Sequence, residues 1–145
     1  MIKVLIEVEA GSCDKTLYDE KTLEYKGTRR GSRPYPYPYG FVIGTSAADG
    51  GSVDCYLITK DQLKFGTIVE CEPIGLLEQD EDGEVDHKVL AALPGQDVEL
   101  GQELLAELRD FICAVFTHFP EVRVTVGRLL PREAALHHIH ESREA

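Results

Sequence analysis

The stretch from Pro34 to Asp54 constrains the fold of this chain more than any other part. It begins with three tyrosines held apart by prolines (PYPYPYG), passes through a short apolar run, and ends in a glycine turn between two acids, Asp49 and Asp54. Because proline fixes φ and lacks an N–H donor, its first half predicts an extended, rigid segment that presents tyrosine hydroxyls at set positions. The Asp-Gly-Gly-Ser turn then places carboxylates in a tight loop. Phenol donors beside clustered carboxylates suit an oxyanion held by a hard metal ion.

Length and charge limit the class of protein. With 145 residues, the chain is expected to form one domain over residues 1–145. Its formal net charge of −11 argues against a nucleic-acid or anionic-membrane partner, because binding to either depends on basic surface. An acidic protein that acts on a polyanion needs local lysines, arginines and bound cations to reverse its field.

The N-terminus and the cysteines both indicate the compartment of the protein. The N-terminus lacks the apolar core of a signal peptide, and no run approaches a transmembrane span, so a cytoplasmic protein is expected. Four scattered cysteines without a C-x-x-C motif favour free, mostly buried thiols over disulfides.

Short apolar runs predict a sheet in the first two thirds of the chain. Ile2–Glu9 alternates apolar and polar residues, which is typical of a half-buried strand. Further runs bounded by glycine, proline or charge predict strands at Tyr39–Gly44, Val53–Thr59, Thr67–Glu72 and Val89–Leu93. Strands of this length and spacing favour a small closed or nearly closed barrel.

Two segments are harder to assign. Gly11–Asp14 is expected to be a turn and Thr22–Lys26 a short strand. The glycine- and arginine-rich segment Gly27–Arg33 is either a solvated loop or, as the densest positive patch of an acidic chain, a phosphate-binding segment, since guanidinium groups match phosphate oxygens.

In the C-terminal third, the spacing of the apolar residues changes from that of a strand to that of a helix. Leucines and aromatic residues at helical spacing predict a long helix over about 99–118, and Pro120 is expected to stop it. Val122–Leu130 is expected to form a last strand, and Pro131 to begin a short helix. Three histidines near the end, His137, His138 and His140, could bind a transition metal, although such clusters on terminal helices are more often incidental.

The motifs together resemble the soluble family I inorganic pyrophosphatases. The matching pieces are IEV (6–8), YPYPYGF (35–41), DGGSVD (49–54) and GTIVECEPIGLLEQDEDGEVDHK (66–88), in the family's order and near its spacing. The resemblance is close over about residues 2–93 and looser through the helix. It implies an α+β fold: a five-stranded, OB-like β-barrel, with one long and one short C-terminal helix packed outside.

The resemblance also implies the site. It suggests magnesium ligands at Asp49, Asp54 and Asp86, with Asp80 or Glu81 as a further ligand because the acidic run can be aligned in two registers. Asp54 is the expected catalytic residue. Phosphate contacts are implied at Lys15, Arg29, Tyr39 and Lys88, and further site-facing side chains at Glu7 and Tyr35. Taken singly, each acid is better read as a solvated loop carboxylate, whereas spacing alone favours neither an inward nor an outward Glu7.

This chain departs from the family pattern at three places. Gly51 stands where the family has the aspartate assigned to activate the attacking water, Leu17 replaces a glutamate, and Phe119-Pro120 replaces a tyrosine–lysine pair. Two functions follow: Mg²⁺-dependent hydrolysis of pyrophosphate or a related phosphoanhydride with reduced activity, or a catalytically degenerate module that binds metal, phosphate or a partner protein. The family's bacterial members are hexamers, so a homo-oligomer is expected, with a dimer or trimer open.

Overall fold

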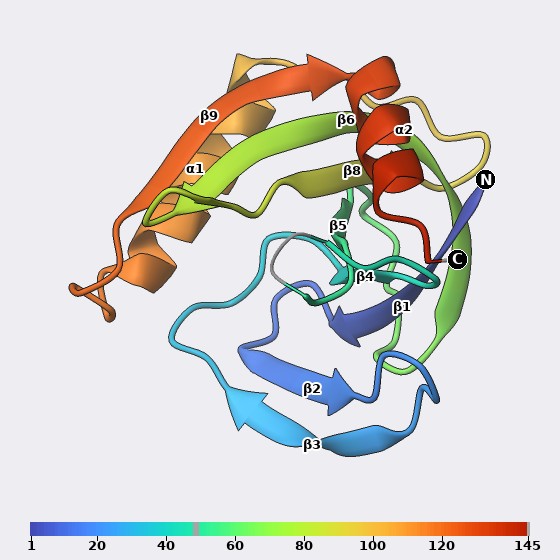
Figure 1. The fold of residues 1–145 in the computed structure, drawn as a ribbon, viewed down its shortest axis with the longest axis horizontal. Coiled ribbons are helices and arrows are strands. Elements are labelled where there is room, and N and C mark those ends of the chain that lie inside the picture. Colours follow the sequence, from blue (N-terminus) through green and yellow to red (C-terminus); the bar gives the residue numbers. More distant parts are fainter. Residues whose placement is uncertain (48–49, 145) are drawn as a thin grey trace.

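The structure is a computed structural model of the chain and describes residues 1–47 and 50–144. Strands curl around one another at its centre, and two helices lie outside them (Figure 1). The elements in chain order are β1 (Ile2–Val8), β2 (Asp14–Tyr18), β3 (Tyr25–Arg30), β4 (Tyr39–Val42), β5 (Asp54–Leu57), β6 (Ile68–Glu81), β7 (Glu84–Val85), β8 (Lys88–Ala92), α1 (Gln102–Phe116), β9 (Val124–Pro131) and α2 (Arg132–Glu141). The predicted α+β class is confirmed.

Five strands of the main sheet close on themselves. β1 pairs antiparallel with β4 on one side and with β6 on the other, and the path from β4 through β5 and β8 returns to β6. β7 and β9 extend from β6 outside this circuit. The expected OB-like arrangement of about five closing strands is therefore confirmed, and the additional strands are built on β6.

The glycine after the last tyrosine of the Pro-Tyr repeat allows β4 to approach β1. A Cβ atom on Gly40 would lie 1.8 Å from the backbone carbonyl oxygen of Leu5, a contact that any other residue would have to relieve by moving the backbone. Gly40 is also paired with Ile6 of β1. The PYPYPYG motif therefore ends where two central strands come closest, which fixes Tyr39 at the wall of the sheet.

Strand β1 is more buried than its alternation predicts. Leu5 and Glu7, on the predicted outward side, are only 2% and 7% exposed. The hydroxyl of Thr16 on β2 donates a 2.6 Å hydrogen bond to the carbonyl of Glu7, so the β2–β3 hairpin packs onto β1. The prediction of a half-buried strand is wrong because this hairpin covers the face that the pattern leaves to solvent.

The hairpin itself differs from the sequence prediction. β2 begins at Asp14, inside the expected turn, and β3 runs from Tyr25 to Arg30, through most of the arginine-rich segment. Both strands are short and polar, so their alternation carries little signal. Their pairing sets Lys15 directly opposite Arg29.

Strand β6 is longer than predicted. It continues from Ile68 past Pro73 to Glu81, with a register irregularity between Pro73 and Gly75 that accommodates the proline. It ends in a tight turn to β7, where Asp82 and Gly83 both have positive φ (54° and 84°). The extension matters because it carries Glu81 to a cavity between the sheet and α1.

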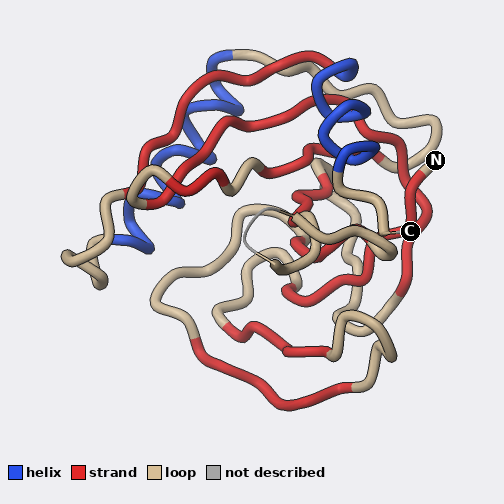
Figure 2. The backbone as a smooth tube through the Cα atoms, viewed as in Figure 1, coloured by secondary structure: helices blue, strands red, loops and turns tan. Residues whose placement is uncertain are grey.

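The helical predictions are confirmed, with shorter boundaries for α1. Leu104, Leu108 and Ile112 are buried at four-residue spacing, and α1 ends at Phe116, before Pro120. α2 begins at Arg132, after Pro131, and packs against β6 and β9. Figure 2 shows that strands and loops make up most of the chain, with both helices beside the β6–β9 side of the sheet. Among the described residues, no helix is long and apolar enough to cross a membrane.

Replacing Leu108 by alanine tests the packing of α1. The Leu108 side chain is fully buried, so Leu108→Ala should lower the free energy of unfolding by about 2–5 kcal/mol through lost burial and an internal cavity. Urea denaturation followed by circular dichroism measures this. The control, Leu136→Ala, removes a leucine that is 48% exposed on α2 and should change stability by less than about 0.5 kcal/mol. Equal losses would contradict the packing described.

Candidate functional site

A cavity of about 280 Å³ opens between the sheet and α1, and most predicted site residues line it. It is bounded by β2 and β3 on one side, by the ends of β5, β6 and β8, and by one face of α1. The predicted residues that line it are Lys15, Arg29, Tyr35, Tyr39, Asp54, Glu81, Asp86 and Lys88. The structure therefore brings together side chains that lie far apart in the sequence.

Lys88 is at the centre of the polar contacts. Its side chain is buried, and its Nζ atom donates to Asp54 at 2.7 Å, to Asp86 at 2.9 Å and to the hydroxyl of Tyr39 at 3.1 Å. Burial opposes the ammonium charge, but Asp54 and Asp86 outweigh it and hold the pKa of Lys88 well above its ordinary value. Lys88 is therefore a permanent cation in the wall of the cavity.

Strand geometry explains how these groups meet. Asp54 is the first residue of β5, and Lys88 is the first residue of β8, its parallel neighbour. Asp86 lies two residues before Lys88, and two-residue spacing in extended chain directs both side chains to one face. The backbone N–H of Asp86 donates to the carbonyl of Gln79 on β6, which holds this short connection in place.

Asp80 and Glu81, the two candidates for the further acidic ligand, lie in different places in the structure. Glu81 lines the cavity, whereas Asp80 lines a different pocket with Asp82 and Arg123. Neighbouring residues of a strand face opposite sides, so only one of the pair can reach the site. The side chain that the structure places there is Glu81.

Glu81 and Asp86 lie close enough to affect each other's charge. Burial, followed by the hydrogen bond and charge of Asp86, raises the pKa of Glu81 to about 7. Asp86 is also desolvated, but the ammonium of Lys88 and the hydrogen bond from Glu81 outweigh this, and its pKa is lowered. A proton shared by this pair therefore resides on Glu81.

Glu7 faces inward beside the site. It is 7% exposed, and burial raises its pKa to about 7; Lys15 opposes this rise, and the charges of Asp54 and Glu20 add to it. It is not among the cavity-lining residues but lies in the field of two of them, Lys15 and Asp54. The side chain of Glu7 therefore points toward the site, as the resemblance suggests, and not outward to solvent.

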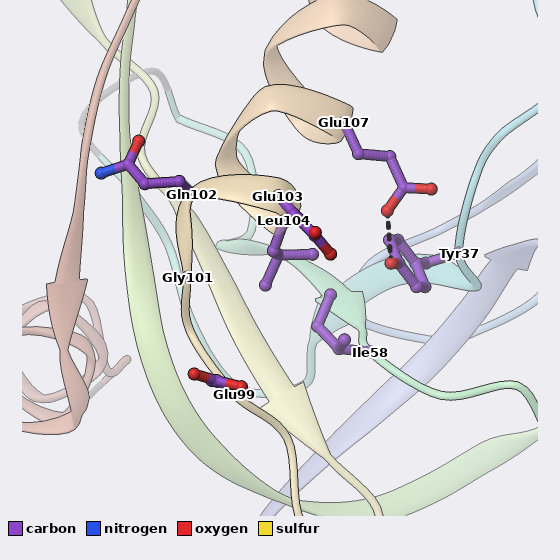
Figure 3. A pocket seen from close by; sticks show the side chains of 8 residues that line it. All are labelled: Tyr37, Ile58, Glu99, Gly101, Gln102, Glu103, Leu104 and Glu107. Atoms are coloured by element: carbon purple, nitrogen blue, oxygen red, sulfur yellow. Dashed lines mark hydrogen bonds between the residues drawn. The ribbon is translucent and has the colours of Figure 1, made fainter.

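The three tyrosines of the Pro-Tyr repeat divide between two sides. The rings of Tyr35 and Tyr39 lie 5.2 Å apart at the cavity, and Tyr35 also contacts Phe111 of α1 at 4.7 Å. Tyr37 points away: its hydroxyl donates to Glu107 in a separate pocket at the start of α1 (Figure 3). The extended segment therefore presents two of its three tyrosines to the site.

The positions of the family departures are also defined. Asp49 lies outside the described residues. Gly51 accepts a hydrogen bond from the N–H of Ala47 in the turn before β5. Leu17 is paired with Gly27 in the hairpin, and Phe119 is 49% exposed. Phe119 and Pro120 do not line the cavity, so the segment just after α1 supplies neither the hydroxyl nor the ammonium group of the family's tyrosine–lysine pair.

Sequence reasoning missed several cavity residues. Tyr56 and Gln79 supply polar groups, and an apolar wall comes from α1; its residues are Phe111, Ile112, Val115 and Phe116. Gln79 precedes Glu81 by two residues, so the alternation of a strand could have identified it once Glu81 was chosen. Nothing in the sequence pattern indicates which face of α1 reaches the site.

The remaining candidates lie elsewhere. His138 is 5.7 Å from the ring of His87, and burial lowers its pKa. Within residues 1–47 and 50–144, no three histidine, cysteine or acidic side chains are grouped as a metal site. All four cysteines are free; Cys55 and Cys71 are buried, whereas Cys113 is exposed, so the expectation of mostly buried thiols holds for half of them.

Fold and site together define a class of protein: an OB-like sheet whose cavity holds carboxylates, a buried lysine and two further cations, groups suited to a phosphate compound. The sequence model of the inorganic pyrophosphatase family matches residues 4–145. The chain therefore belongs to the inorganic pyrophosphatase family.

Individual relatives agree with this assignment. The chain is 33% identical over 123 residues to an inorganic pyrophosphatase of Nanoarchaeum equitans, covering 83% of this chain and 76% of that protein. It is 40% identical over 94 residues to one from Sulfolobus acidocaldarius, covering 63% of this chain and about half (54%) of that protein. The crystal structure of the Thermus thermophilus inorganic pyrophosphatase superposes with a TM-score of 0.84 at 26% identity, covering 97% of this chain and 87% of that one.

The raised pKa of Glu7 predicts a pH dependence of stability. Because the folded protein holds a proton on Glu7 up to about pH 7 and the unfolded chain releases it near 4.5, Glu7 lowers stability progressively between pH 4.5 and 7. Glu7→Gln should therefore leave stability unchanged at pH 4 and raise it by about 3 kcal/mol at pH 8. Thermal unfolding across this range measures the difference.

The control for this prediction is Glu24→Gln, an exposed glutamate on the loop before β3. It should give the same stability difference at every pH. If Glu7→Gln shows no growing advantage between pH 4.5 and 7, Glu7 is solvated in the folded protein.

Proposed function

We propose that this chain hydrolyses inorganic pyrophosphate to two phosphates in a Mg²⁺-dependent reaction, as one pyrophosphatase-like domain over residues 1–145. The observation that carries the proposal is the pairing of Lys15 with Arg29 across the β2–β3 hairpin, with both side chains lining the cavity. Like charges directly opposite each other destabilise a hairpin, and an anion between them removes that penalty. The relatives described above are inorganic pyrophosphatases, and this supplies the substrate class.

The donor type of the cavity residues suits magnesium, although the described carboxylates do not form a ready-made cluster of three metal ligands. Asp54, Glu81 and Asp86 bring hard oxygen donors to one cavity from different elements, which is the donor type that Mg²⁺ prefers. The contact between Glu81 and Asp86 is one that a cation between them would stabilise. With Asp49, these are the residues that would hold the ion. The position of Asp80 in another pocket leaves it out of this set. When bound, Mg²⁺ supplies charge neutralisation and a water of lowered pKa.

The cationic wall would bind the phosphate groups. Lys15 and Arg29 lie on the hairpin side of the cavity and Lys88 on the sheet side, so a pyrophosphate between them would contact cations at both ends. The hydroxyl of Tyr39 accepts from Lys88 and so has its own proton available for a phosphate oxygen. These contacts give an acidic protein the local positive field that binding a polyanion requires.

The departures from the family pattern support reduced activity. Gly51 offers no carboxylate near the site, and Leu17 and Phe119-Pro120 bring no polar side-chain group to it. A positioned general base contributes about 10²–10⁴-fold, so hydrolysis driven by electrostatic stabilisation would continue at a lower rate.

Substitution of Asp54 tests the proposal. In Asp54→Asn, the amide oxygen can still accept from Lys88, but the negative charge that would hold the metal is lost. Phosphate release from pyrophosphate with excess Mg²⁺ should fall by at least about 10²-fold, while circular dichroism shows an intact fold. The matched control is Asp97→Asn, an exposed aspartate outside the cavity, and it should retain wild-type release. Equal activity in wild type and Asp54→Asn would refute the assignment.

A degenerate binding module is the second candidate function. The apolar wall of α1 and the absence of a carboxylate at Gly51 favour it, because a site with phosphate grips and no water-activating group binds without turnover. In that case the wild-type protein would release no phosphate yet bind Mg²⁺ or inorganic phosphate in calorimetry.

Restoring an acid at position 51 separates the two candidates. Gly51→Asp should raise turnover by about 10²-fold or more if the rest of the site is competent. Steady-state phosphate release measures this, with Gly51→Asn as the control that adds a similar volume without a base. No gain would favour the module.

A further inference from the structure

The side chain of Gln79 is fixed in the wall of the cavity. It lies on β6 and is 3% exposed. Its backbone N–H donates to Nδ1 of His87 at 3.0 Å, and its carbonyl accepts from the N–H of Asp86 at 2.9 Å. A side-chain hydrogen bond joins it to Glu81. The two backbone hydrogen bonds fix the position of Gln79 on the strand, and the contact with Glu81 orients its carboxamide.

The carboxamide oxygen of Gln79 has no donor within the protein. Among the described residues, Oε1 of Gln79 is the buried side-chain nitrogen or oxygen atom that no hydrogen bond reaches. Leaving a buried acceptor unpaired is unfavourable, and a methionine or leucine would fill the same space without that penalty. An acceptor of this kind in a cavity wall indicates a donor that belongs to the contents of the cavity.

The neighbouring groups exclude most donors. The ammonium of Lys88 already donates to Asp54, Asp86 and Tyr39, which uses its three hydrogens. Ionised phosphate oxygens accept hydrogen bonds and cannot donate to an amide oxygen. A water molecule is the remaining donor that fits a polar recess beside carboxylates.

We propose that Gln79 is a positioning residue, whose Oε1 accepts a hydrogen bond from a water molecule in the cavity and orients that water for attack on phosphorus. A carboxamide does not take up a proton at neutral pH, so Gln79 directs the water's lone pair and leaves proton acceptance to another group. This inference rests on the proposed hydrolysis of pyrophosphate.

Gln79→Met tests this role. Methionine has nearly the same volume and no acceptor of comparable strength; it removes both the unpaired acceptor and the hydrogen bond to Glu81, and the variant should remain folded. In the same variant, kcat for pyrophosphate should fall at least about tenfold while KM changes less than about twofold. A crystal structure of the wild type should show a water within hydrogen-bond distance of Oε1, and that water should be absent from the variant.

A purely structural glutamine gives the opposite pattern. Gln79→Met would then retain wild-type kcat, and that result overturns the proposal. Gln102→Met, on the exposed start of α1, is the matched control and should change neither quantity. If the wild type releases no phosphate, the proposed function fails by itself. The crystallographic water then still decides whether Gln79 holds a water.

Discussion

The rest of the site depends on the ion pairs and the hydrogen bond that the buried ammonium of Lys88 makes. This ammonium joins Asp54 at the start of β5 to Asp86 before β8, and it reaches Tyr39 on β4. Three strands of the closed sheet therefore meet at one cation. Removing a partner from a buried ion pair leaves an uncompensated charge, so the cation and the carboxylates require each other. The same three contacts leave Lys88 charged and fixed in the wall where a phosphate would bind.

Around this cation lie ionisable groups whose surroundings disfavour their charged forms or place like charges together. Glu7 is a buried carboxyl and Glu81 a half-buried one, each with a pKa raised to about 7, and Lys15 lies directly opposite Arg29. Perturbed groups of this kind gather at functional sites because binding relieves them. Cations favour the carboxyl side and anions the hairpin side, so a metal–pyrophosphate complex would relieve both at once.

Most of the architecture was predictable because its signals are local. The apolar runs of β4, β5 and β8 and the helical spacing of α1 each carry their own period. β2 and β3 were not predictable in this way, since their short polar sequences gain their structure by pairing with each other and packing on β1. Similarly, the burial of Glu7 depends on that hairpin rather than on the alternation of β1.

The sequence by itself determined which chemical groups are available: acids in two turns, tyrosines between prolines, and one lysine two residues after an aspartate. The order of these groups along the chain was enough to identify the family, because that order can be read from the sequence alone. The tertiary structure decided which of them meet. It brought Glu81 and not Asp80 to the cavity, turned Tyr37 away from it, and added Gln79 and the apolar face of α1. These choices depend on the register of β6 and on which surfaces pack together, and such contacts between distant segments have no local signature in the chain.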